Sequence, residues 1–108
     1  MGPLPEYFPD LTGFQWDAGN SDKNWLAHGV TQNETEQVFF HRPVLVTPDL
    51  VHSQAEPRYY VLGRTTVGRR LTVAFTIRTS LIRPIMARDM SRKERRLYGE
   101  EKHAQEDV

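Results

Sequence analysis

The chain has 108 residues, no cysteine and a formal net charge of zero. This length supports a single domain with its own core, and the lack of cysteine excludes disulfides and thiolate metal sites. No apolar run approaches the roughly 20 residues of a membrane helix, and residues 1–13 lack the pattern of a secretory signal. We therefore expect a small cytoplasmic protein without membrane association.

The N-terminal third predicts an extended arm, a short strand and a helix. Three prolines within residues 1–13 indicate the arm, and the alternation of residues 14–16 predicts a strand. A helix should follow and end at His28, because Gly29 stands where a left-handed C-cap is favourable. Its N-cap is one of three residues whose side chains accept hydrogen bonds from free backbone N–H groups: Asp17, Asn20 or Ser21.

A second helix should begin after Thr31, which has the capping-box spacing to Glu34. We expect this helix to include residues 38–40 and to stop before Pro43, since the residue before proline disfavours helical backbone. Residues 44–46 predict a strand, and residues 47–57 a loop.

The following segment predicts strands over residues 59–65, 71–78 and 81–87, with a turn at residues 66–68. The middle strand alternates, so one face should be buried and the other exposed. The expected buried residues are Leu71, Val73, Phe75 and Ile77, and the expected exposed ones are Thr72, Ala74, Thr76 and Arg78. Pro84 indicates an edge strand or a bulge.

A second capping box, Ser91 to Glu94, predicts a helix that runs to about Glu101, with a frayed tail after it. The order of elements is then β-α-α-β-β-β-β-α. Short turns between the strands indicate a mainly antiparallel sheet with helices packed on it, which is an α+β domain.

Positive charge is concentrated in residues 58–96. This segment has eleven cations and only Asp89 and Glu94 as anions, so its charge is 11 − 2 = +9. Such asymmetry in a neutral chain points to a polyanionic partner, although a solvated surface of scattered arginines is the alternative. The cations are Arg58, Arg64, Arg69, Arg70, Arg78, Arg83, Arg88, Arg92, Lys93, Arg95 and Arg96.

Arg64, Arg78 and Arg88 each stand at the end of a predicted strand. If the strands are adjacent, these guanidiniums can converge at one end or on one face of the sheet. Guanidinium groups form paired hydrogen bonds with phosphate oxygens, and they can stabilise the extra negative charge of a pentacoordinate phosphate during cleavage. An isolated arginine in this position is an exposed surface charge.

Other side chains suit proton transfer or base stacking. His28 fits general acid or base catalysis, or a simple interaction with the C-terminus of its helix. Glu56 fits a general base, or a surface ion pair with Arg58. Tyr59 and Tyr60 could stack on unpaired bases, but neighbours on a strand point to opposite faces, so one of them belongs to the core. His41 and His52 have the appearance of loop residues.

The order and spacing of short motifs resemble the BrnT family of toxins from bacterial type II toxin–antitoxin modules. The resemblance covers about residues 14–101, which leaves an N-terminal extension (1–13) and a C-terminal tail (102–108). The motifs are Phe14-Gln15-Trp16-Asp17, Lys23-Asn24, His28-Gly29-Val30, Glu56-x-Arg58-Tyr59, Leu62-Gly63-Arg64, Gly68-Arg69, Phe75-Thr76-x-Arg78, Ile82-Arg83, Ala87-Arg88 and Lys93-Glu94-Arg95.

This resemblance implies a RelE-like fold, with an antiparallel sheet packed with two N-terminal helices and one C-terminal helix. It also implies an endoribonuclease toxin that forms a hetero-oligomer with a BrnA-type antitoxin, and contact with operator DNA only through that antitoxin. Two residues depart from the family pattern: Ala27 replaces a lysine and Met86 replaces a serine.

We therefore predict an endoribonuclease that needs no metal or other cofactor, because the 2′-OH of the RNA substrate can attack the adjacent phosphate. Such an enzyme needs a proton acceptor, a proton donor and cations. The predicted catalytic residues are His28, Arg64, Arg78, Arg88 and Glu56, and the predicted RNA-binding residues are Lys23, Arg58, Arg69, Arg83 and Tyr59. The alternatives are a non-catalytic nucleic-acid-binding domain and a purely structural partner of the antitoxin.

Overall fold

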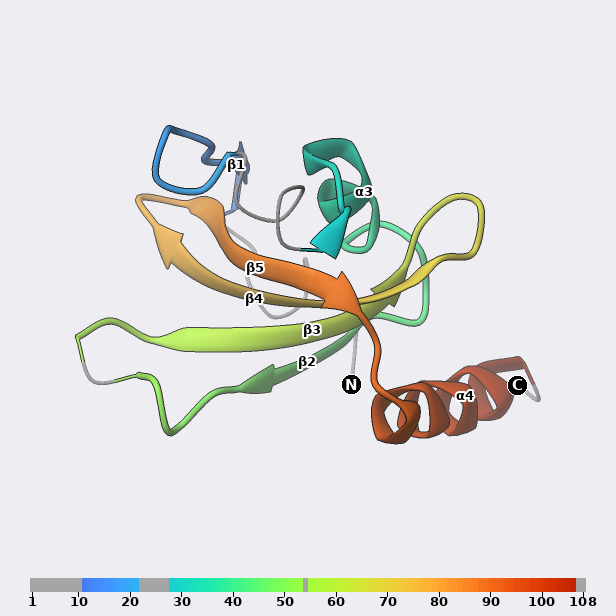
Figure 1. The fold of residues 1–108 in the computed structure, drawn as a ribbon. Coiled ribbons are helices and arrows are strands. Elements are labelled where there is room, and N and C mark those ends of the chain that lie inside the picture. The colour runs from blue at the N-terminus through green and yellow to red at the C-terminus, as the bar shows by residue number, and fades with distance from the viewer. Residues whose placement is uncertain (1–10, 22–27, 54, 107–108) are drawn as a thin grey trace.

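A computed structural model describes residues 11–21, 28–53 and 55–106, with side chains described to Gly99 (Figure 1). These residues form an α+β domain with a five-stranded sheet in the order β1-β5-β4-β3-β2. Neither helix in this part of the chain is long and apolar enough to cross a membrane. The elements are β1 (Gly13–Phe14), α3 (Gln32–Gln37), β2 (Leu45–Pro48), β3 (Arg58–Arg64), β4 (Arg70–Arg78), β5 (Leu81–Asp89) and α4 (Arg92–Glu106).

The sheet is mixed: it is mainly antiparallel, as the turns predicted, but the wholly antiparallel sheet implied by the family resemblance is wrong at one edge. Strands β2 to β5 pair antiparallel, as the short turns predicted, but β1 pairs parallel to β5 through Gly13 and Phe14. One edge of β5 already pairs with β4 in the β4–β5 hairpin. The other edge pairs with β1, which comes from the N-terminal segment and is distant in sequence. Sequence proximity therefore could not set its direction.

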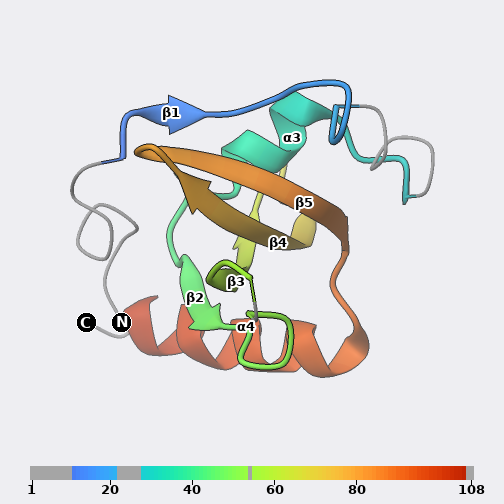
Figure 2. The same ribbon diagram turned by 90° about the vertical axis from the view of Figure 1, so that its left-hand side faces the viewer.

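The two described helices lie on opposite sides of the sheet (Figures 1 and 2). On the side of α3, which we call the inner face, α3 and its following turn contribute Val38 and Phe39 to the core. Figure 2 shows α4 passing under β2 and β3 on the other side. The buried Tyr98 anchors α4, because its hydroxyl donates a 2.8 Å hydrogen bond to the carbonyl of Pro43. The core cluster comprises Val30, Val38, Phe39, Val44, Val46, Val61, Leu71, Val73, Phe75, Ile82 and Ala87.

Both capping boxes are confirmed. Thr31 and Glu34 exchange side chain–backbone hydrogen bonds at the start of α3, and Ser91 and Glu94 do the same at the start of α4. Helix α3 is shorter than expected, because residues 38–40 form a tighter turn with i to i−3 hydrogen bonds. Helix α4 is longer than expected and runs to Glu106, since residues 102–106 contain no helix breaker.

The predicted first helix lies on residues 22–27, outside the described residues. At its expected end, His28 is helical and Gly29 has φ +64°, the left-handed conformation predicted for its C-cap. The two described helices therefore support the α+β class, whereas the finer RelE-like arrangement with three helices stays a prediction.

Strand β4 is buried on both faces, which corrects the expectation of one exposed face. Thr72 and Thr76 are 0% and 1% exposed. As the central strand, β4 is flanked on both sides, and its hydroxyls have protein partners: Thr72 donates to Glu94 of α4, and Thr76 donates to the carbonyl of Pro57. The pattern correctly predicted a strand, but burial followed from its central position.

Candidate functional site: an arginine face and its hollow

Six arginines of the three long strands share the face opposite to α3, which we call the arginine face. Directly paired residues of neighbouring strands point to the same side, and Arg58 pairs with Thr76, which pairs in turn with Arg83. In the same way, Arg64 pairs with Arg70, and Thr72 pairs with Arg88. Arg78 lies two residues beyond Thr76 and therefore shares its side. The six are Arg58, Arg64, Arg70, Arg78, Arg83 and Arg88.

The antiparallel order divides these arginines into two groups. Arg58, Arg78 and Arg83 lie toward the β4–β5 hairpin, whereas Arg64, Arg70 and Arg88 lie toward the β3–β4 turn. Arg58 and Arg64 are six positions apart in β3, which corresponds to about 20 Å along the strand. The sequence-predicted trio Arg64, Arg78 and Arg88 thus shares a face, but Arg78 is at the opposite end from the other two.

The first group surrounds a hollow of about 190 Å³, which we call the arginine hollow. Glu56, Arg58, Arg78 and Arg83 line it together with Gly19, Asn20, Thr76, Pro84 and Ile85. The bulge in β5 that Pro84 predicted is present here, since the register between β4 and β5 shifts at this level. Asn20 holds one side of the hollow against β5, because its buried side-chain amide donates hydrogen bonds to the backbone carbonyls of Gln15 and Pro84.

Two of the three arginines at the hollow hold carboxylates with paired hydrogen bonds. Arg78 donates to Glu56 at 2.7 and 3.1 Å, and Arg83 donates to Asp17 at 2.8 and 3.1 Å. In the part of the chain whose side chains are described, no ion pair involves Arg58. The hollow therefore contains one guanidinium without a carboxylate partner among these residues and two that are already oriented.

The hollow is electropositive around Glu56. Hydrogen bonds from Arg78 lower the pKa of the Glu56 carboxyl, and the charges of Arg78, Arg83 and Arg58 act in the same direction. Hydrogen bonds from Arg83 likewise lower the pKa of Asp17. Both carboxylates are therefore ionised at neutral pH, and Glu56 can accept a proton in this state.

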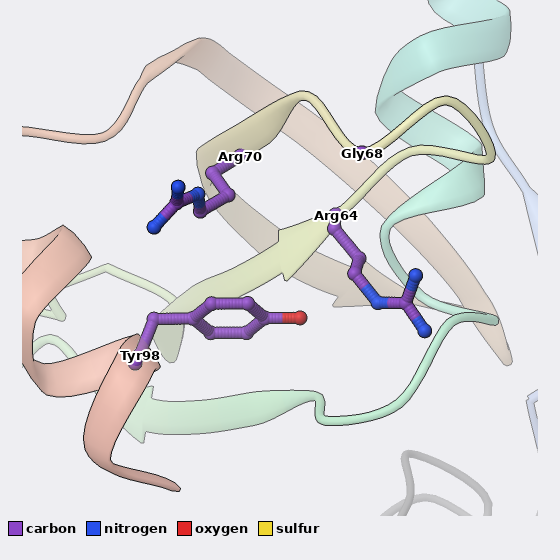
Figure 3. Close-up of a pocket in the computed structure, with 5 residues that line it drawn as sticks. Arg64, Gly68, Arg70 and Tyr98 are labelled. Carbon is purple, nitrogen blue, oxygen red and sulfur yellow. The ribbon is translucent and has the colours of Figure 1, made fainter. Parts of the chain in front are cut away.

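At the other end of the arginine face, α4 covers the sheet. Arg88 forms paired hydrogen bonds with Glu94 at 2.7 and 3.1 Å. Arg64 and Arg70 line a second hollow of about 330 Å³ with Tyr98 (Figure 3). Figure 3 shows their guanidiniums pointing in different directions, and Arg64 donates to the carbonyl of Arg42.

The predicted residues His28 and Arg69 lie on the other side of the sheet. The exposed His28 is close enough to Asp89 to lower the pKa of that carboxyl, as Arg69 does more strongly. Arg69, just before β4, donates to Asp89, Glu34 and the carbonyl of Gly29, so it connects the end of β5 with the start of α3. The structure does not bring His28 to Glu56 and Arg78, and Arg69 is occupied by protein groups. Predicted Lys23 lies outside the described residues.

The two adjacent tyrosines separate as expected, but the predicted RNA-binding tyrosine is the one on the inner face. Tyr59 stacks on Phe75, with ring centroids 5.5 Å apart, and packs against the core. Tyr60 pairs with Ala74 on the arginine face. Tyr60 is therefore the tyrosine that shares the face of the arginines.

Sequence reasoning did not select Arg70 and Asn20 as site residues. The sequence pattern could have placed Arg70 on the arginine face, because Arg70 continues the alternation of Thr72, Thr76 and Arg78. Asn20 had none, since its partners are carbonyls distant in sequence. Among the described residues, no group of three or more His, Cys, Asp or Glu side chains could hold a metal ion.

A comparison with known protein families gives a match that covers the candidate site. A family model described as the ribonuclease toxin BrnT of type II toxin–antitoxin systems matches residues 16–94. This range includes β2 to β5, Asn20 and Glu94, and it confirms the resemblance that the sequence motifs predicted. No curated protein matches the chain.

Proposed function

Because the chain belongs to the BrnT family of ribonuclease toxins of type II toxin–antitoxin systems, we propose that it is an endoribonuclease that cuts RNA at the arginine hollow. The observation that supports this location is the gathering of Glu56, Arg58, Arg78 and Arg83 around one hollow. A carboxylate surrounded by three guanidiniums can accept a proton next to a bound phosphate. Of the residues predicted to be catalytic, only Glu56 and Arg78 lie there.

In the proposed reaction, the RNA supplies its own nucleophile. The substrate 2′-oxygen attacks the adjacent phosphorus while Glu56 takes the 2′-hydroxyl proton, and the bond from phosphorus to the 5′-oxygen breaks. The products are a 2′,3′-cyclic phosphate and, once the leaving 5′-oxygen has taken up a proton, a 5′-hydroxyl. Arg58, Arg78 and Arg83 offset the extra negative charge of the pentacoordinate transition state, as positioned donors do at an oxyanion.

Guanidinium suits this role because it stays charged at every physiological pH and its planar donors match phosphate oxygens. The chemistry in this proposal uses protein cations and requires no added metal ion. Arg64 of β3 and its partner Arg70 of β4, about 20 Å from Arg58 along the strand direction, lie where they would hold a more distant phosphate of the same RNA strand. His28 receives no chemical role in this proposal, because it lies on the inner face beside Asp89.

We propose that a protein antitoxin of the BrnA type neutralises this activity in the cytoplasm by forming a complex with the toxin. The antitoxin would also connect the complex to operator DNA. Support for this partner comes from the family, since type II systems pair a toxin with a protein antitoxin.

The test is RNA cleavage by the purified protein in the presence of EDTA, with identification of the product ends. We expect cyclic phosphate ends, resistance of a 2′-deoxy nucleotide at the cut, and full activity in EDTA. Arg58→Ala should lower the rate by about 10²- to 10³-fold, the loss typical of an oxyanion donor. The matched control is Arg92→Ala, which removes the same charge from an exposed position on α4.

Expression in bacteria provides a second readout. The parent chain should arrest growth and Arg58→Ala should not, and co-expression of the antitoxin should restore growth to cells with the parent chain. RNA binding without any cleavage would contradict the proposal and would favour a non-catalytic RNA-binding domain. Equal cleavage rates for Arg58→Ala and Arg92→Ala would show that the arginine hollow is not the site.

A further inference from the structure

A histidine–aspartate pair lies in the loop between β2 and β3. Asp49 is 6% exposed, and its carboxylate oxygens lie 2.8 Å from His52 Nδ1 and 3.3 Å from the His52 backbone nitrogen. Because Asp49 occupies Nδ1, the nitrogen left to exchange a proton with a ligand is Nε2. The His52 side chain is 55% exposed, so a ligand can reach it. A buried carboxylate that orients an exposed imidazole is an arrangement suited to proton transfer.

The loop that carries this pair is fixed to the start of β3. The hydroxyl of Ser53 donates to the carbonyl of Asp49 and accepts a 2.9 Å hydrogen bond from the backbone N–H of Arg58. The backbone N–H of Asp49 donates to the carbonyl of Arg58 at 2.8 Å, which extends the ladder between β2 and β3 by one position. Asp49 is therefore opposite Arg58, at about one strand spacing of 4.8 Å.

The pair lies on the arginine face. Thr47 pairs with Tyr60 on that face, and Asp49 is two residues further along, so it points to the same side. Burial raises the pKa of the Tyr60 hydroxyl, and the nearby Asp49 carboxylate acts in the same direction. The charges of Arg88 and Arg58 also reach Tyr60. Arg58 thus stands between the His52–Asp49 pair and the arginine hollow that it lines.

Among the described residues that line the arginine hollow, none is suited to protonate the leaving group. Cleavage produces a 5′-oxyanion that has to be protonated, but guanidinium does not give up its proton in proteins. Glu56 is ionised and takes the proton of the 2′-hydroxyl in the proposed reaction. Histidine can donate a proton at neutral pH, and His52 is held by Asp49, the residue opposite Arg58 on this face.

We propose that His52 is the general acid of the cleavage reaction and that Asp49 is its positioning residue. This inference rests on the proposed ribonuclease function. As the bond from the 2′-oxygen to phosphorus forms and the bond to the 5′-oxygen breaks, the proton on His52 Nε2 passes to the 5′-oxygen. Asp49 holds the Nδ1 proton and stabilises the imidazolium. Proton exchange with water then returns His52 and Glu56 to their starting states.

The test compares two RNA substrates that differ in one atom. One has the natural 5′-oxygen at the cut, and the other has a bridging 5′-sulfur, whose thiolate leaves without a proton. His52→Ala should cut the natural substrate about 10²- to 10³-fold more slowly than the parent, and it should cut the sulfur substrate at nearly the parent rate. The matched control is His41→Ala, because His41 contacts Thr66 in the β3–β4 turn at the far end of the sheet.

Asp49→Asn tests the positioning role and keeps the size of the side chain. It should lower kcat on the natural substrate without changing KM, and it should have little effect on the sulfur substrate. Added imidazole should restore part of the activity of His52→Ala on the natural substrate. A variant that merely folds poorly would lose both substrates together and would not respond to imidazole.

The inference is overturned if His52→Ala cuts the natural substrate at the parent rate, or if it is equally impaired on both substrates. In either case the proposed ribonuclease function stands as long as the parent protein cuts RNA and Arg58→Ala does not. A parent protein that cuts neither substrate would overturn both the function and the role of His52.

Discussion

Glu94 is the residue whose replacement gives the sharpest prediction about stability. Its carboxylate accepts hydrogen bonds from the Thr72 hydroxyl at 2.9 Å, from the Ser91 backbone N–H at 2.8 Å, and from both terminal nitrogens of Arg88. It therefore joins the start of α4 to the central strand and to the arginine face. Glu94→Gln keeps the shape and one acceptor oxygen but removes the charge that Arg88 faces.

The magnitude follows from the pKa of Glu94. Burial raises this pKa, but the hydrogen bonds from Arg88, Ser91 and Thr72 outweigh it and lower the pKa from 4.5 to about 2. At about 1.4 kcal/mol per pKa unit, the ionised carboxylate would stabilise the fold by at most about 3 kcal/mol. The Glu94 and Arg88 side chains are 22% and 34% exposed, so solvent screening reduces the expected value to about 1–2 kcal/mol at pH 7.

The direction in which stability depends on pH follows from the pKa of Glu94, which is lower in the folded state than in the unfolded state. The stabilisation is fully present above pH 4.5 and is lost as the pH falls toward about 2. Urea unfolding of the parent and Glu94→Gln at a series of pH values measures the difference between their free energies of unfolding. Other carboxylates contribute equally to both proteins and cancel. We expect a difference at pH 7 that shrinks below pH 4.5, and a difference independent of pH would refute the reasoning.

Three further predictions address packing, turn geometry and RNA contact. Gly63→Ala should destabilise the fold by about 1–3 kcal/mol in urea unfolding, because the new Cβ would lie 2.6 Å from the backbone carbonyl oxygen of Val38. The control is Gly99→Ala, whose Cβ would have nothing within 4 Å. Thr79→Asn combined with Ser80→Gly should raise the free energy of unfolding by about 1 kcal/mol. Thr79 and Ser80 have positive φ, 51° and 68°, which asparagine and glycine adopt with less strain. An unchanged urea midpoint of unfolding would contradict this prediction. RNA binding should weaken with salt. Arg58→Ala should reduce the steepness of log binding constant against log salt concentration by about 0.7, the value for one lost phosphate contact. An unchanged slope would show that Arg58 does not contact a phosphate.

Local chemistry was sufficient to predict most of the elements. The capping boxes of Thr31 and Ser91 fixed where α3 and α4 begin, since each depends on a hydrogen bond to the third helical residue. Gly29 indicated a left-handed backbone, and the alternation along β4 identified a strand. These signals involve residues within a few positions of one another, so they act before any tertiary contact forms.

The candidate site was only half predictable from the sequence. The motifs identified the family, and the cations of residues 58–96 indicated an anionic partner. The number of free charges could not be predicted, because carboxylates from outside this segment neutralise three of its arginines: Asp17 pairs with Arg83, Glu34 with Arg69, and Glu56 with Arg78. Each of these contacts joins residues more than 20 positions apart.

The sequence by itself determined the element types, the family and the residue types available for chemistry. Tertiary structure decided which of those residues meet. The register of β3, β4 and β5 put six arginines on one face, and the antiparallel order separated Arg64 from Arg78. It turned Tyr60 rather than Tyr59 toward that face and set Asp49, the partner of His52, opposite Arg58. The reason is that strand pairing joins distant segments through backbone hydrogen bonds, which do not depend on the side chains that they bring together.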